Sequence, residues 1–130
     1  MKATELMIGD LVCLEDDTKY ELPLKVDGTL TDDISLEGDG FLGGIDGLIR
    51  PIPITPEILE KNGFTKVNSQ RYDYGYPDTD CYVKVNPKKN MIHVNGRNAN
   101  SNLYSHSFVH ELQNALRLCG LNELADNFKV

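Results

Sequence analysis

The stretch Ser107-Phe108-Val109-His110-Glu111-Leu112-Gln113-Asn114-Ala115-Leu116-Arg117-Leu118-Cys119-Gly120 carries the clearest structural pattern in this chain of 130 residues. Its apolar residues recur at the spacing of one helical face, which predicts an amphipathic helix covering a hydrophobic core. The predicted core face is Phe108, Val109, Leu112, Ala115, Leu116 and Cys119. The predicted solvent face is His110, Gln113, Asn114 and Arg117. We expect Ser107 to cap the start of this helix and Gly120 to end it in a left-handed conformation.

The residues before this helix predict an antiparallel sheet for it to cover. Residues 64–67 form one expected strand, and residues 81–85 and 91–94 form a hairpin. A polar loop over residues 97–102 follows, and residues 103–106 form a candidate last strand, so three or four strands are expected. A short helix over residues 56–62 precedes the sheet, with Thr55 as its cap, Pro56 as its first residue and Gly63 at its end. Residues 121–126 predict a short closing helix.

Residues 1–50 alternate between short apolar runs and turn signals, which is typical of short strands. Residues 6–14 are expected to form a strand pair or one bent strand, with the bend at Gly9-Asp10. Residues 20–26 are expected to form a further strand, with Pro23 on a sheet edge. Asp27-Gly28 and residues 31–33 predict turns. The fold class is therefore α+β. A small antiparallel β-barrel-like half (1–50) is followed by an Ile/Pro-rich joint (51–56) and a helix–sheet–helix half (57–130), expected to fold as one cooperative unit.

Two resemblances add to this interpretation. The pattern Leu6-x-x-Gly9-Asp10-x-Val12 resembles the first strand of SH3-like small barrels, which implies a fold that mostly binds proteins or nucleic acids. The segments 51–64 and 109–121 together resemble a family of small uncharacterised bacterial proteins, common in gut-bacterial genomes and prophage-like islands. This resemblance implies a bacterial or prophage context and no known activity, so it transfers no catalytic residue.

Composition narrows the function classes. The net charge is −7, which disfavours nonspecific nucleic-acid binding. A local basic patch of Lys84, Lys88, Lys89 and Arg97 keeps nucleic acid open as an alternative. No apolar run reaches the ~20 residues of a membrane span, and we expect no signal peptide, so a cytoplasmic protein is predicted. The three cysteines, Cys13, Cys81 and Cys119, are predicted to be buried free thiols.

Two chemical motifs are weak. Gly38-x-Gly40-x-x-Gly43 matches the dinucleotide fingerprint, but no helix-forming segment follows, so residues 37–47 are interpreted as a surface loop without a cofactor. His110-Glu111 begins like a zinc-protease motif whose second histidine is replaced by Asn114. His106, His110 and Glu111 therefore define only a secondary hypothesis, a metal-dependent enzyme, and no metal is expected.

The strongest candidate for function is the tyrosine-rich segment of residues 71–78. In a strand, Tyr72, Tyr74 and Tyr76 share one face, and tyrosine offers a large amphipathic area for recognition. We expect a binding surface made by Arg71, Tyr72, Tyr74, Tyr76, Arg97 and Asn98. The preferred function is a non-enzymatic protein-interaction or accessory module that binds an unknown protein or a second copy of itself. The alternatives are a nucleic-acid-associated accessory protein and the metal-dependent enzyme.

Overall fold

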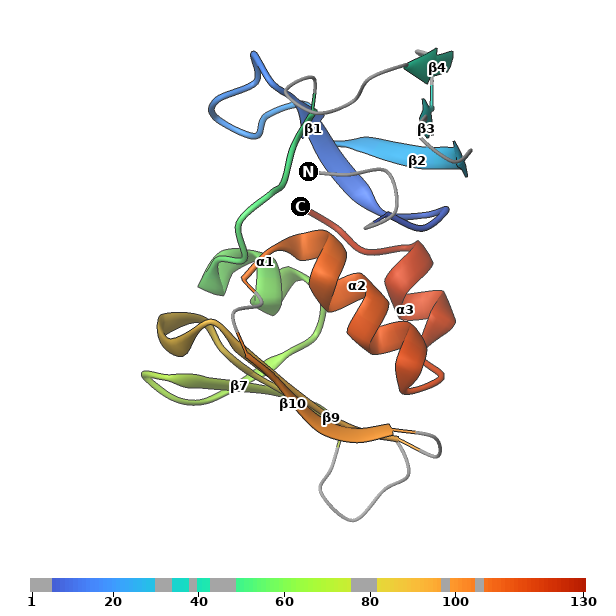
Figure 1. Ribbon diagram of the computed structural model, residues 1–130. Coiled ribbons are helices and arrows are strands. Elements are labelled where there is room, and N and C mark those ends of the chain that lie inside the picture. The colour runs from blue at the N-terminus through green and yellow to red at the C-terminus, as the bar shows by residue number, and fades with distance from the viewer. Residues whose placement is uncertain are drawn as a thin grey trace. The chain divides into compact units, whose positions relative to one another are not determined.

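A computed structural model describes residues 6–29, 34–37, 40–42, 49–75, 82–96, 99–104 and 107–130 (Figure 1). The chain divides into two compact units, Met1–Ile52 and Pro53–Val130. The boundary lies inside the predicted Ile/Pro-rich joint. The chain combines helices with antiparallel sheets, so the α+β class is confirmed. None of the helices in the described ranges has the length and apolar character needed to cross a membrane.

The first unit contains one antiparallel sheet in the order β4-β3-β2-β1-β5. Its strands are β1 (Leu11–Leu14), β2 (Leu24–Thr29), β3 (Ile34–Leu36), β4 (Gly40–Leu42) and β5 (Ile49–Arg50). The core of this unit consists of Leu6, Val12, Val26, Leu36 and Ile49. Since β4 and β5 are edge strands, the described strands form an open sheet and no closed barrel.

Three predictions for the first unit were wrong in detail. Asp27 and Gly28 lie inside β2, where the register shifts between Val26 and Gly28, so this pair makes a bulge and not a turn. The strand expected over residues 20–26 begins only after Pro23. Part of the loop expected over residues 37–47 is strand β4; residues 38–39 and 43–47, like the turn expected at residues 31–33, lie outside the described residues.

The expected bend at Gly9 and Asp10 is present, but no strand precedes it among the described residues. Gly9 has a φ of 96°, a conformation that glycine adopts without strain, and its N–H donates to Val26 O at 2.7 Å. The Asp10 carboxylate accepts the Met7 N–H at 2.8 Å, which closes the turn that leads into β1.

The second unit contains a second antiparallel sheet, in the order β10-β9-β8-β7-β6. Its strands are β6 (Thr65–Asn68), β7 (Arg71–Gly75), β8 (Tyr82–Asn86), β9 (Met91–Gly96) and β10 (Ala99–Tyr104). The helices are α1 (Pro56–Lys61), α2 (Val109–Leu118) and α3 (Asn122–Asp126), and a single 3-10 turn, Pro87–Lys89, joins β8 to β9. The polar loop expected up to residue 102 is wrong from residue 99 onward, because those residues form β10.

The helices α2 and α3 lie on the same side of this sheet (Figure 1). The sheet contributes buried side chains to the core from one face, and α2 contributes its apolar face. The sheet residues of this core are Tyr72, Val83, Val85, Ile92 and Val94. The buried residues of α2 are Val109, His110, Leu112, Gln113, Ala115 and Leu116.

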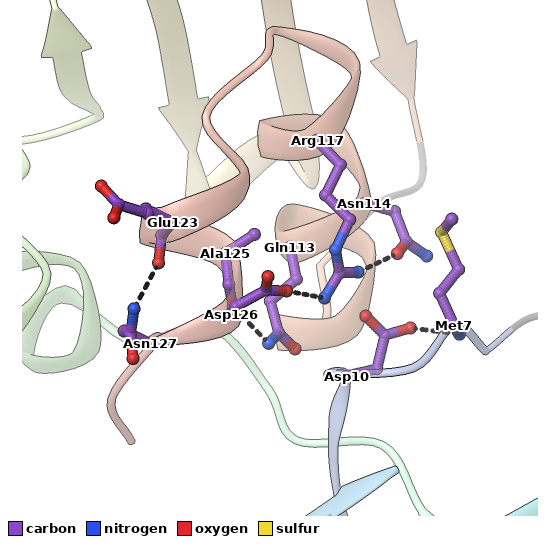
Figure 2. A network of polar contacts seen from close by, with 9 residues as sticks. All are labelled: Met7, Asp10, Gln113, Asn114, Arg117, Glu123, Ala125, Asp126 and Asn127. Carbon is purple, nitrogen blue, oxygen red and sulfur yellow. Dashed lines mark hydrogen bonds and ion pairs between the residues drawn. The ribbon is translucent and has the colours of Figure 1, made fainter. Parts of the chain in front are cut away.

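Two of those α2 residues correct the prediction, because His110 and Gln113 were expected to face solvent. His110 is 5% exposed and Gln113 is 0% exposed. Gln113 Nε2 donates to the backbone oxygen of Ala125 in α3 at 2.9 Å (Figure 2). The α3 helix therefore covers a face of α2 that the heptad-like spacing of apolar residues assigns to water.

The start of α2 also differs from the prediction. Phe108, and not Ser107, is the N-cap residue, and its side chain makes no capping hydrogen bond. Glu111 caps the helix instead: its Oε1 accepts the Ser107 N–H at 3.1 Å and the Phe108 N–H at 3.2 Å. The expected end is confirmed, because Gly120 has a φ of 82°.

The short helix α1 agrees with its prediction. Thr55 is the N-cap, its hydroxyl accepts the Ile58 N–H at 3.3 Å, Pro56 follows, and Gly63 has a φ of 84° after the last turn.

Asn62, the residue that follows the last turn of α1, is buried and only 7% exposed. Its Nδ2 donates to Ile58 O and to Lys129 O, both at 2.8 Å, and its Oδ1 accepts the Lys129 N–H at 2.8 Å. One side chain therefore fastens the C-terminal segment to α1.

Asn62→Ala is expected to destabilise the second unit by about 1–3 kcal/mol, because it leaves the buried Ile58 oxygen and the partly buried backbone groups of Lys129 without this partner. Urea unfolding measures the loss, and hydrogen exchange at the Lys129 amide measures the release of the segment. Asn127→Ala is the matched control, because Asn127 Nδ2 also donates to the carbonyl four residues earlier, Glu123 O at 2.9 Å, but at the surface (Figure 2). Equal, small effects of both substitutions would contradict the assigned role of Asn62.

Candidate interaction surface

Strand β7 divides the tyrosine-rich segment between the two faces of its sheet. Tyr72 pairs with Val85 and is 4% exposed, so it belongs to the core and not to a contact surface. Tyr74 pairs with Val83 on the same face and is half-buried, with its ring centroid 5.5 Å from that of Phe64. The expected tyrosine surface is therefore wrong for Tyr72. Tyr76, Arg97 and Asn98, the other expected contact residues, lie outside the described residues.

The opposite face of β7 presents Arg71 and Asp73, which join Tyr82 of β8 in a polar network. Arg71 Nε donates to Asp73 Oδ1 at 2.8 Å, and Arg71 Nη2 donates to Oδ2 at 2.7 Å. The Tyr82 hydroxyl donates to the same Oδ2 at 2.9 Å and also contacts Arg71 Nη2. The two strands are thereby cross-linked by side chains, and the guanidinium is held in one orientation.

This network reinforces the usual protonation states of Arg71 and Tyr82. Burial, followed by the hydrogen bond to Asp73, raises the pKa of Tyr82 above its usual value. The hydrogen bond to Asp73 raises the pKa of Arg71. Arg71 is therefore charged and Tyr82 neutral at physiological pH. Arg71 Nη1 donates to no partner in the described ranges, and the side chain is 37% exposed, so part of the guanidinium faces solvent.

Lys84 extends this face across the sheet. It pairs with Asp73 of β7 on one side and with His93 of β9 on the other, so all three residues share the face of Arg71. Lys84 is partly exposed, and its Nζ lies 5.8 Å from the centroid of the Tyr82 ring. At that distance the ring attracts the ammonium group and helps to position it.

The turn after β8 adds two more cations at the end of the sheet. Lys88 and Lys89 are exposed in the 3-10 turn. Asn86 Oδ1 accepts the Lys89 N–H at 3.2 Å, and Asn90 takes the left-handed conformation with a φ of 51°. Neither lysine forms an ion pair within the part of the chain that the structure describes.

We call the set of these groups the basic face; its residues are Arg71, Asp73, Tyr82, Lys84, Lys88 and Lys89, with four cations and one carboxylate. Its charge is opposite to that of the chain. Residues 64–104 contain six Lys/Arg and three Asp/Glu, although the whole chain has a net charge of −7. The basic face is thus a local positive region on an acidic protein, suited to long-range attraction of an acidic partner.

The chain matches no protein-family model, and neither a curated protein nor a solved structure is significantly similar to it. The geometry of its own residues therefore carries the functional argument.

Two of the three residues of the metal hypothesis, His110 and Glu111, have other roles. His110 is buried at the start of α2 with its ring stacked on Phe108, the ring centroids 6.2 Å apart. Glu111 accepts backbone N–H groups. His106 lies outside the described residues. In the described part of the chain, no group of three His, Cys, Asp or Glu side chains is arranged to hold a metal ion.

The cysteines that the structure describes are buried free thiols, as expected for Cys13 and Cys119. Burial, reinforced by the neighbouring Asp17 carboxylate, raises the pKa of Cys13 to about 12. A thiol with such a pKa is almost entirely protonated at neutral pH and is a poor nucleophile. Cys81 lies outside the described residues.

Sequence reasoning missed the Arg71–Asp73–Tyr82 network, although one signal was present. Arg71 and Asp73 are two residues apart in a strand, so they share a face opposite to the tyrosines. Tyr82 could not be added from sequence, because its position depends on the pairing of β7 with β8.

Proposed function

We propose that this chain is a non-enzymatic interaction or accessory module, and that the basic face binds an acidic protein partner. One observation carries the proposal: four cations and one carboxylate lie together on the sheet face opposite the core and in the turn at its end, in a chain that is acidic elsewhere. The strands fix the backbone, and the Arg71–Asp73–Tyr82 network fixes the central side chains. Binding then immobilises few groups, which lowers its entropic cost.

Nucleic acid is the second candidate, because Lys84, Lys88 and Lys89 belong to one hairpin and could contact phosphates. The aromatic groups oppose it. Tyr72 and Tyr74 lie on the other face of the sheet, and Tyr82 is 4% exposed, so none of these three tyrosines offers a stacking platform on the basic face. An acidic protein surface requires no such platform.

Self-association through a sheet edge is less favoured by the structure than binding at the basic face. The edge strand β6 is exposed throughout, but it carries Lys66 and a register shift between Lys66 and Asn68. Both features protect an edge from pairing with another strand.

We further propose that the protein works in a reducing cytoplasm, which the free thiols support. We also propose a bacterial, prophage-associated origin, which rests on the sequence resemblance alone.

The proposal is tested with a photo-crosslinking amino acid placed at position 84 in the full chain, expressed in the organism that encodes it. We expect crosslinks from position 84 to a defined acidic protein, identified by mass spectrometry. The same probe at Lys19, an exposed lysine of the first unit, is the matched control. Raising the salt concentration to about 0.5 M should weaken the crosslinking, since charges at a surface are screened.

Crosslinks only to nucleic acid would replace the proposal with the second candidate, and crosslinks only between copies of the chain would replace it with self-association. No difference between positions 84 and 19 would overturn the proposed surface.

A further inference from the structure

We infer that a small pocket beside the Lys88–Lys89 turn of the basic face receives a single apolar side chain from an acidic segment of the partner. The pocket is lined by Pro53, Ile54, Val85, Pro87, Asn90 and Ser107. All six residues belong to the second unit. This inference rests on the proposed function and specifies the chemistry of the partner.

The pocket has fixed walls. Ile54 N–H donates to Ser107 O at 2.9 Å, and Pro53 forms a β-bridge with Phe108, so these two segments are joined backbone to backbone. On the other side, Pro87 and Asn90 bound the 3-10 turn. A site that is formed before binding loses little conformational entropy when a ligand enters.

The size and the chemistry of the pocket suit one apolar residue. Its volume is about 220 Å³. Cavities of roughly 150 Å³ hold a molecule the size of benzene, so a leucine or phenylalanine side chain is of suitable size. Four of the six lining residues, Pro53, Ile54, Val85 and Pro87, are apolar, and Asn90 and Ser107 supply polar groups. Such a composition is typical of pockets that bind an apolar anchor and orient it by a few hydrogen bonds.

The charge next to the pocket determines what flanks the anchor. Lys88 and Lys89 lie in sequence between the lining residues Pro87 and Asn90, and both are exposed. An apolar anchor inserted here would place its neighbouring residues close to two ammonium groups. Acidic neighbours would be attracted and basic neighbours repelled, so the occupant is an acidic peptide segment with one large apolar residue.

Three fluorescein-labelled peptides test the inference by fluorescence anisotropy with the full chain. The first is Glu-Asp-Leu-Asp-Glu, the second has Ser in place of Leu, and the third is Lys-Arg-Leu-Arg-Lys. We expect the first to bind and the second to bind roughly tenfold or more weakly, because it lacks the leucine side chain that the pocket would bury. The basic peptide should not bind.

Two variants locate the binding. Ser107→Phe fills the pocket, and Lys88→Ala with Lys89→Ala removes the charges beside it. Each of these two changes should lower the affinity for the first peptide at least about fivefold. Lys19→Ala with Lys61→Ala removes two exposed lysines elsewhere and should leave binding unchanged. Circular dichroism and urea unfolding show that each variant is folded. The lysine pair lies on the surface, so it keeps the test valid if Ser107→Phe does not fold.

The outcomes separate this inference from the proposed function. The pocket proposal would be wrong, and the basic face would stand, if position 84 crosslinked to a partner but no peptide bound. The same holds if the first peptide bound equally well to the Ser107→Phe variant. A labelled single-stranded oligonucleotide that binds more tightly than the first peptide, and equally well with Ser107→Phe, would overturn the peptide in favour of nucleic acid. Loss of both crosslinking and peptide binding would end both proposals.

Discussion

Leu116→Ala and Leu112→Ala are each expected to destabilise the second unit by about 2–5 kcal/mol, the range for truncating a buried leucine. Both leucines are 0% exposed on the face of α2 that meets the sheet core. The truncation removes apolar area from the interior and leaves a cavity that the rigid sheet cannot close. This is a large fraction of the total stability of a small domain.

Leu118→Ala is the matched control in the same helix, because Leu118 is 54% exposed. It should change the free energy of unfolding by less than about 0.5 kcal/mol, as surface substitutions usually do. Urea unfolding followed by circular dichroism measures all three variants. Similar losses for the three leucines would show that α2 is not packed against the sheet as described.

Sequence patterns predicted those elements whose signals are local. Thr55, Pro56 and Gly63 each act within a few residues of α1, and its start and end were confirmed. The β8–β9 hairpin was confirmed for the same reason, because its apolar runs are separated by turn-forming residues. Gly120 also ended its helix as expected.

Predictions that depended on distant partners were wrong. Asp27 and Gly28 are a turn signal in isolation, but pairing with β3 makes them a bulge inside β2. Tyr72 looked like a surface residue, because the sequence does not say which face of β7 meets the helices. The candidate surface consequently moved from the tyrosines to the alternate positions Arg71 and Asp73.

The buried face of α2 shows most clearly that a sequence pattern does not reveal partners that are distant in the chain. Gln113 is polar, and its position relative to Leu112 and Leu116 assigned it to solvent. The backbone carbonyl of Ala125 is the partner that makes its burial tolerable, and only the docking of α3 brings that carbonyl near. A buried polar residue with a tertiary partner leaves no mark in the hydrophobic pattern.

Gln113→Glu is expected to destabilise the second unit by about 3–5 kcal/mol at pH 7, the range for an uncompensated buried charge. The substitution keeps the size of the side chain but removes the Nε2 donor, and a carboxylate oxygen then faces the carbonyl oxygen of Ala125 (Figure 2). Burial at 0% exposure should raise the pKa of the new carboxyl above its unfolded value of about 4.3.

The sign of the pH dependence follows from that raised pKa. Below about pH 4 the carboxyl is protonated in both the folded and the unfolded chain, so the charge penalty vanishes. Between the unfolded and the folded pKa, the penalty grows with pH by about 1.4 kcal/mol per unit. The difference in unfolding free energy between the variant and the wild type should therefore be smaller at pH 5 than at pH 7.5, as measured by urea unfolding at both pH values.

Asn114→Asp is the matched amide-to-acid control on the same helix. Asn114 Oδ1 accepts from Arg117 Nη1 at 2.8 Å, so a carboxylate there gains an ion pair and should cost less than about 0.5 kcal/mol at pH 7. If Gln113→Glu were as mild as Asn114→Asp, or if its cost did not change with pH, Gln113 would not be enclosed between α2 and α3. A large, pH-dependent loss at position 113 alone would establish that α3 seals a polar core position that the sequence pattern assigns to water.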